Sequence, residues 1–157
     1  LTMTSRVAIV TGSNKGIGYG IVRNLLKYPF DGDVYLTSRD VQRGLDAVKQ
    51  LKEEIGIESK YHQLDIDDED SIIKLRDFLA SNYNGLDVLV NNAAIAYAND
   101  STAPVSEQAE NTLKTNYFST KSACQILFPI LKPHARVVNV SSSAGMLQRI
   151  PGHFFIT

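Results

Sequence analysis

The 157-residue sequence has only one cysteine, Cys124, and no tryptophan. A single cysteine cannot form a disulfide within the chain, and no group of cysteines and histidines has the spacing of metal ligands. The sequence therefore predicts neither a disulfide-stapled nor a zinc-built fold, and no bound metal. This usage is typical of a reducing compartment, so we expect a cytoplasmic protein.

Neither sign of charge is in excess, since 16 lysines and arginines face 17 aspartates and glutamates for a formal net charge of -1. Such a balance lacks the electrostatic footprint of a protein that binds nucleic acid or an anionic membrane. Residues 1–4 have neither the basic start nor the long apolar run of a signal peptide or membrane span. We therefore expect a small-molecule partner, and leave the oligomeric state open.

Internal repeats and linker-like stretches are also absent, so we expect a single domain over residues 1–157. Short apolar runs predict strands at Val7–Val10, Val34–Leu36, Val88–Val90 and Val137–Val140, with a weaker strand near a sheet edge at 59–65. Helical spacing follows in Ile17, Ile21 and Leu25, in Val41, Leu45 and Val48, in Ile72, Leu75 and Leu79, and in Leu113, Tyr117 and Leu127. Residues 96–106 are expected to form a loop. This alternation predicts a doubly wound α/β fold with a parallel sheet.

A glycine-rich loop, T-G-S-N-K-G-I-G, joins the first strand to the first helix at residues 11–18. Gly12 permits a tight turn, Gly16 lets the backbone approach a pyrophosphate, and Gly18 allows close helix packing. Ser13, Asn14, Lys15 and Ile17 complete the expected cofactor-binding loop. The spacing differs from G-x-G-x-x-G, and the alternative is an ordinary strand-to-helix turn. We favour an NAD(P)-binding, Rossmann-like domain.

The second strand ends in Ser38-Arg39-Asp40, about 20 residues after the loop, where such folds distinguish NAD from NADP. Arg39 suits the 2′-phosphate of NADP, and Lys15 adds a second positive charge. A solvated surface charge is the alternative for Arg39. Asp40 is either a ribose ligand or, as we favour, the N-cap of the next helix. The predicted cofactor is NADP, as NADPH.

Together these residues resemble the short-chain dehydrogenase/reductase family, and in particular its NADPH-dependent carbonyl reductases. Further matching segments are H-Q-L-D-I-D-D at 62–68, G-L-D-V-L-V-N-N-A-A at 85–94, K-T-N at 114–116 and R-V-V-N-V-S-S at 136–142. The resemblance covers nearly everything from residue 6 to residue 143. It implies the reduction of a carbonyl compound to an alcohol, with hydride taken from NADPH.

The resemblance also implies roles for single residues. Asp65 and Ile66 would contact adenine, although Asp65 is equally expected to cap the helix that follows. Asn92 would lie near the cofactor ribose. Asn116 would bend a helix and hold a water of the proton relay, the alternative being a solvated helix residue, and Ser142 would bind the substrate carbonyl.

Ala94 stands where this family usually has glycine. If that position requires a positive φ, alanine costs roughly 1 kcal/mol there and disturbs the cofactor loop.

The family places a catalytic tyrosine and lysine, Y-x-x-x-K, after the serine, and no tyrosine follows Tyr117 in this sequence. The pair Tyr117 and Lys121 has the spacing but precedes Ser142, so we do not assign it to catalysis. Two hypotheses remain. The chain is the N-terminal portion of a carbonyl reductase, with C-terminal strands missing and little activity alone, or it is a natural short isoform or pseudoenzyme that binds dinucleotide without chemistry.

Overall fold

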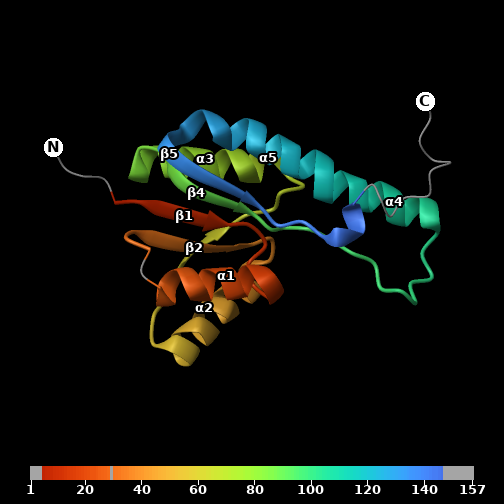
Figure 1. Ribbon diagram of the computed structural model, residues 1–157, viewed down its shortest axis with the longest axis horizontal. Helices are drawn as coiled ribbons and strands as arrows, with labels where there is room; N and C mark the ends of the chain where they lie inside the picture. Colours follow the sequence, from red (N-terminus) through yellow and green to blue (C-terminus); the bar gives the residue numbers. More distant parts are fainter. Residues whose placement is uncertain (1–4, 29, 147–157) are drawn as a thin grey trace.

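The computed structural model describes residues 5–28 and 30–146 (Figure 1). Five parallel strands form one sheet in the order β3-β2-β1-β4-β5. They are β1 (Val7–Val10), β2 (Asp33–Ser38), β3 (Lys60–Gln63), β4 (Leu86–Asn91) and β5 (Leu131–Asn139). The predicted doubly wound sheet is confirmed, and β3 lies at an edge as expected. The strand order reverses at β1, so a crevice opens at the carboxyl ends of β1 and β4.

The helices are α1 (Gly16–Lys27), α2 (Val41–Ile55), α3 (Glu69–Tyr83), α4 (Val105–Leu113) and α5 (Thr120–Leu127), with the π-helical turn η1 (Lys114–Ser119) between the last two. The 3-10 turns η2 (Phe128–Ile130) and η3 (Ser143–Gly145) flank β5. In Figure 1, α1 and α2 cover one side of the sheet while α3 and α5 cover the other. Helix α4 begins at Val105, within the stretch 96–106 expected to be a loop.

The predicted helical stripe is buried throughout in α3 but only in part in α1 and α2. Ile72, Leu75 and Leu79 of α3 are all buried, as predicted, whereas Ile17 in α1 is 67% exposed and Val41 in α2 is 50% exposed. Leu45, Leu113 and Tyr117 are exposed as well. Ile21 and Leu25 of α1 and Val48 of α2 pack against the core as predicted. The buried residues that were not predicted are Gly18 and Val22 in α1 and Gly44, Ala47 and Leu51 in α2.

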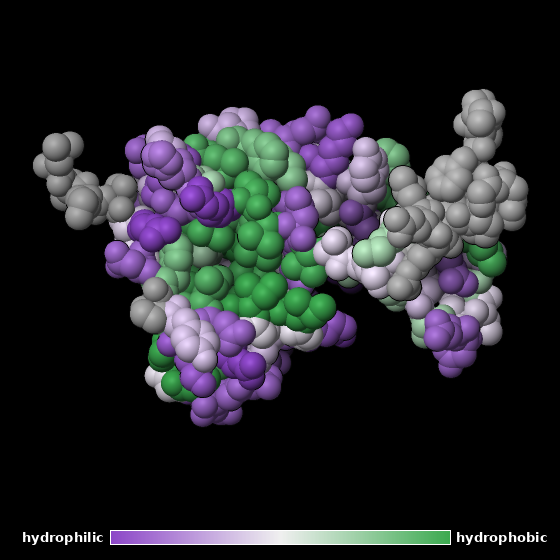
Figure 2. All heavy atoms as spheres, in the orientation of Figure 1, coloured by the Kyte–Doolittle hydropathy of each residue, from purple (hydrophilic) through white to green (hydrophobic). Residues whose placement is uncertain are grey.

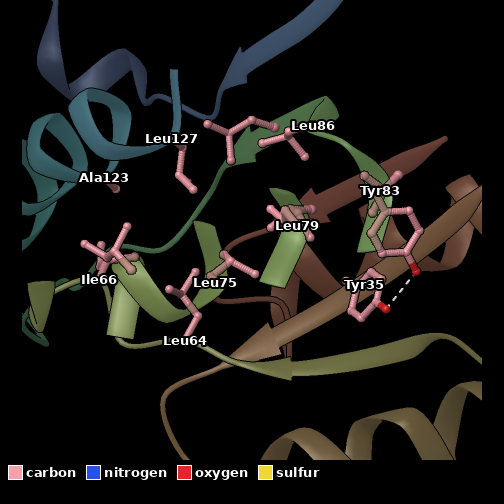
Figure 3. Close-up of a cluster of buried hydrophobic side chains, with 13 residues drawn as sticks. Tyr35, Leu64, Ile66, Leu75, Leu79, Tyr83, Leu86, Ala123 and Leu127 are labelled. Atoms are coloured by element: carbon pink, nitrogen blue, oxygen red, sulfur yellow. Dashed lines mark hydrogen bonds between the residues drawn. The ribbon is translucent and has the colours of Figure 1, made fainter. Parts of the chain in front are cut away.

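Two apolar clusters fill the space between the sheet and its helices. One packs β1, β4 and β2 against α3 and α5, and Figure 3 shows its leucines around Leu79 with Tyr35 and Tyr83 at one end. The other packs the opposite face of the sheet against α1 and α2. The hydroxyls of Tyr35 and Tyr83 are hydrogen-bonded to each other at 2.8 Å. Both clusters anchor the strands whose carboxyl ends carry the polar residues described below.

One face of the molecule stays partly apolar. Figure 2 shows hydrophobic residues gathered in the middle of the face that Figure 1 presents, over the sheet and α1. Val138 on β5 and Val140 directly after it are exposed. In the described part of the chain β5 pairs only with β4, so it is the second edge of the sheet. An apolar edge of this kind promotes association between chains.

Candidate active site

A cavity of about 380 Å³ lies at the carboxyl ends of β1, β2 and β3, beside the loop after β4. It brings together most of the residues predicted to bind the cofactor: Gly12, Asn14, Lys15, Gly16, Ile17, Arg39, Asp65, Ile66 and Asn92. Ser13 and Gly18 were also predicted to bind the cofactor, but they do not line this cavity. Residues from four separate segments thus meet at the crevice where open α/β sheets bind their ligands.

The glycines of the loop differ in what surrounds them. Gly12 has φ +59°, and a Cβ there would come within 2.8 Å of Ala93 Cα. Gly16 has φ +61° but faces open space, with no atom within 4 Å of an added Cβ. A backbone that is left-handed and uncovered on the cavity side can approach a bulky anion closely.

The start of α1 has no side-chain cap and no acidic residue in its first turn. In contrast, α2 and α3 begin with capping aspartates, Asp40 and Asp68, each of which accepts a backbone N–H. The first amides of α1, together with the positive end of the helix dipole, therefore point to the cavity as an anion site. This arrangement fits a pyrophosphate.

Ser13 and Gly18 support the loop from within the fold. The buried Ser13 Oγ donates to the Val10 carbonyl at 2.7 Å and accepts from the Thr37 N–H at 2.9 Å. Gly18 is buried, and an added Cβ would lie 2.4 Å from Asn92 Nδ2. The close packing expected of Gly18 is confirmed. A direct cofactor contact by Ser13 or Gly18 stays a prediction.

Asn92 joins the glycine loop to the end of β4. Its Nδ2 donates to the carbonyls of Thr11 at 2.9 Å and Gly12 at 3.0 Å. Thr11 adds two hydrogen bonds between the same loops, because its Oγ1 accepts the N–H groups of Asn92 and Ala93. The sequence analysis gave Thr11 no role, since nothing in its local pattern reveals a partner 81 residues away.

Asp40 caps α2, as favoured from the sequence. Its Oδ1 accepts the Arg43 N–H at 2.8 Å, so this oxygen is used by the helix rather than by a ribose. The neighbouring Arg39 is exposed and lines the cavity together with Lys15. Two cationic residues therefore line the cavity.

Asp65 does not cap α3, because Asp68 does so by accepting the Asp70 N–H at 3.1 Å. The Asp65 Oδ1 instead accepts the Asp67 N–H at 3.0 Å, which shapes the turn that lines the cavity. Asp67 and Thr115 also line the cavity and were not predicted. The Thr115 hydroxyl donates to Asp67 Oδ2 at 2.9 Å, a contact that only the folded chain brings together.

A second cavity, of about 920 Å³, adjoins the first along the loop after β4. Asn116 and Ser142 both line it, as do Tyr97, Thr112 and Asn139. Asn116 lies in η1, and its amide grips one residue of the loop: Oδ1 accepts the Ile95 N–H at 2.8 Å and Nδ2 donates to the Ile95 carbonyl at 2.9 Å. The expected distortion of the helix at Asn116 is therefore a π-helical turn.

Tyr117 and Lys121 are both exposed and do not line either cavity. Tyr97 is the tyrosine that the second cavity does contain, and its hydroxyl accepts a hydrogen bond from Asn111 at 2.8 Å. No lysine of the described residues lines this cavity. A tyrosine with a lysine beside it is thus missing near Ser142 within residues 5–28 and 30–146.

Ala94 does not adopt a left-handed backbone. Among the described residues other than glycine, positive φ occurs only at Asn84 and His134. The condition under which alanine would strain the loop is therefore not met, and the exposed methyl group is accommodated.

Residues 6–154 match the family described as short chain dehydrogenase. The chain belongs to this family. Carbonyl reductase (NADPH) 3 of Rattus norvegicus is 57% identical over 146 residues, which are 93% of this chain and 52% of that protein. Salutaridine reductase from Papaver somniferum has a TM-score of 0.81 and 35% identity, covering 92% of this chain and 60% of that one. The Pseudomonas aeruginosa RhlG/NADP active-site complex has a TM-score of 0.75 and 31% identity, covering 91% of this chain and 57% of that one.

This short-chain dehydrogenase spans about half the length of the carbonyl reductases it matches. In the described part of the chain, no helix is long and apolar enough to cross a membrane, and no group of acidic, cysteine and histidine side chains could hold a metal ion.

Proposed function

We propose that this chain forms the NADPH site of a cytoplasmic carbonyl reductase that converts a ketone or aldehyde to an alcohol. The observation that carries the proposal is the junction of the two cavities. One has an uncapped helix start, an open glycine and two cations, and the other contains Asn116 and Ser142. Asn92 and Ile95 line both cavities, so a ligand in one lies next to a ligand in the other.

The described residues fit NADPH at several points. The first amides of α1 would bind the pyrophosphate, Arg39 and Lys15 the 2′-phosphate, and Asp65 and Ile66 the adenine. A carbonyl reductase relative and the NADP complex of a structural neighbour support this choice of cofactor. When bound, NADPH supplies the hydride.

In the second cavity Ser142 would donate a hydrogen bond to the substrate carbonyl. Asn116 would act differently from a free side chain, because both of its amide atoms are engaged by Ile95. It would hold the loop after β4 against η1 and so fix the wall shared by the two cavities. A proton relay at this point would then depend on the π-helical turn that contains Asn116, rather than on the Asn116 amide itself.

We further propose that the chain alone binds NADPH but reduces carbonyl compounds slowly, because a tyrosine–lysine pair is missing beside Ser142 in the described part. General acid catalysis by such a pair raises the rate of the chemical step by roughly 10²–10⁴-fold. The alternative is an isoform that only binds dinucleotide, and it also predicts NADPH binding without rapid turnover. The two hypotheses differ in whether the gene encodes a longer form with a Y-x-x-x-K pair after Ser142.

Fluorescence titration with NADPH tests the proposal cleanly, since the chain has no tryptophan to interfere. The proposal is supported if NADPH binds at least tenfold more tightly than NADH, a difference in binding free energy of about 1.4 kcal/mol. Equal affinity would contradict the role given to Arg39. Rapid turnover of a carbonyl substrate by the 157-residue chain would refute the proposed dependence on further residues and return attention to Tyr97, Tyr117 and Lys121.

A further inference from the structure

The turn that carries Arg39 is held by side chains on both sides. Ser38 Oγ donates to the Asp40 carbonyl at 2.6 Å, and Asp40 caps α2. Gly44 lies directly against this turn, since an added Cβ would be 2.4 Å from Ser38 Oγ. The residues before and after Arg39 are therefore fixed.

The Arg39 peptide itself is held by Gln63. Gln63 Nε2 donates to the Arg39 carbonyl at 3.2 Å. The last backbone bond of the β2–β3 ladder runs from the Leu64 N–H to the Ser38 carbonyl at 3.0 Å. The Gln63 side chain thus continues the ladder by one residue, to the position that presents a cation to the cavity.

Gln63 is in turn oriented from α3. The hydroxyl of Ser71, which is buried, donates to Gln63 Oε1 at 3.1 Å and accepts the Asp65 N–H at 3.0 Å. This bond fixes which end of the Gln63 amide faces Arg39, because a hydroxyl donor requires the amide oxygen. One chain of three hydrogen bonds therefore connects Arg39, Gln63, Ser71 and Asp65.

We infer that Gln63 is a positioning residue that gives the site its selectivity for NADPH, by fixing the backbone from which Arg39 reaches the 2′-phosphate. The inference rests on the proposed function. A bidentate contact between guanidinium and phosphate depends on geometry, so a cation on a loose turn loses part of its advantage. Gln63 touches neither cavity wall, which separates its role from direct binding.

The test is the ratio of NADPH to NADH affinity, measured by fluorescence for the wild type and for Gln63→Met, which keeps the side-chain length without hydrogen-bonding groups. We expect the ratio to fall about fivefold, the effect of losing one hydrogen bond, with NADH affinity nearly unchanged. Gln50→Met, on the exposed surface of α2, is the matched control and leaves the ratio unchanged. Arg39→Ala gives the reference for complete loss of the phosphate contact.

An unchanged ratio in Gln63→Met, or an equal fall in both affinities, would overturn the inference while leaving the proposed function intact. If Gln63→Met does not fold, as judged by circular dichroism, Ser71→Ala replaces it. That variant loses the bond that orients Gln63, so the ratio must again fall, in addition to any loss of affinity common to both cofactors. A wild-type chain without preference for NADPH would instead contradict the proposed cofactor, together with any role of Gln63 in selecting it.

Discussion

The side-chain amide of Asn92 occupies the space in which residue 18 would carry a Cβ, 2.4 Å from where that carbon would be. The same amide hydrogen-bonds the Thr11 and Gly12 carbonyls, so it cannot move aside without breaking both bonds. The glycine loop and the loop after β4 are thereby one packed unit.

We expect Gly18→Ala to lower the free energy of unfolding by about 2–3 kcal/mol, because the new methyl group also meets the Ser13 Cα and the Gly12 carbonyl. Gly20→Ala in the same helix is the control, since an added Cβ there meets nothing within 4 Å. That control should gain about 0.5–1 kcal/mol from helix propensity. Urea unfolding followed by circular dichroism measures both, and equal effects would contradict the packing described.

The open backbone at Gly16 predicts a loss of binding rather than of packing. Gly16→Ala pays about 1 kcal/mol for its positive φ and places a methyl group in the cavity, so NADPH affinity should fall at least tenfold, roughly 1.4 kcal/mol. Gly56→Ala at the end of α2 has the same conformational cost, with φ +71° and open space around it. It should lose similar stability and keep its affinity. Similar NADPH affinities in the two variants would mean that no phosphate group approaches Gly16.

The double contact between Asn116 and Ile95 predicts a local effect on the loop after β4. In Asn116→Ala the Ile95 N–H loses its acceptor, so its hydrogen exchange should become about fivefold faster, for a hydrogen bond of about 1 kcal/mol. Asn82→Ala removes an exposed asparagine that bonds its own helix at Phe78, and should leave exchange at Ile95 unchanged. Amide exchange by NMR decides. Unaltered protection of Ile95 would show that the loop holds its position without Asn116.

Acid should weaken the fold through Asp33. Burial raises the pKa of the Asp33 carboxyl, but hydrogen bonds from Lys60 and Tyr83 outweigh it and leave the pKa below its ordinary value. The unfolded chain then binds the proton more tightly, so the stability contributed by this carboxylate is present above about pH 4 and is lost as pH falls through the lowered pKa. The wild type should lose more stability between about pH 5 and pH 2 than Asp33→Asn does.

The comparison uses urea unfolding at several pH values, with Asp100→Asn, an exposed aspartate of the loop before α4, as the control. At pH 7 we expect Asp33→Asn to be less stable by about 1 kcal/mol, a modest value because Lys60 is half exposed and screened by water. If the acid sensitivity of the two variants matches, Asp33 is not the group responsible.

The sequence predicted the strands best where both faces of the sheet are covered, because buried parallel strands are continuously apolar. It missed the first half of β5, where Lys132, Pro133 and His134 break the apolar pattern and the pairing with β4 shifts register. It also placed the buried faces of α1 and α2 only in part. Gly18, Gly44 and Ala47 lie on those faces, and a pattern of large apolar residues does not reveal positions where the helix approaches closely.

The candidate site divides in the same way. The loop from Gly12 to Gly18 and the tip of β2 were predictable because their chemistry is contiguous in the chain. Gln63 and Thr115 were not, since each acts through a partner that is 24 or 48 residues distant. Family resemblance located Asn116 but not its grip on Ile95, which depends on the loop after β4 folding back on η1.

The π-helical turn at Lys114–Ser119 also sets the direction in which the side chains of α5 point relative to those of α4. A π turn holds one residue more than an α turn, and each residue of an α-helix advances the direction of its side chain by about 100°. Deleting one residue between Leu113 and Thr120 would let α4 and α5 run as one straight helix. Either Ala123 and Leu127 would then leave the core or the hydrogen bond between Tyr97 and Asn111 would break, so the length of this segment is fixed by the packing on both of its sides.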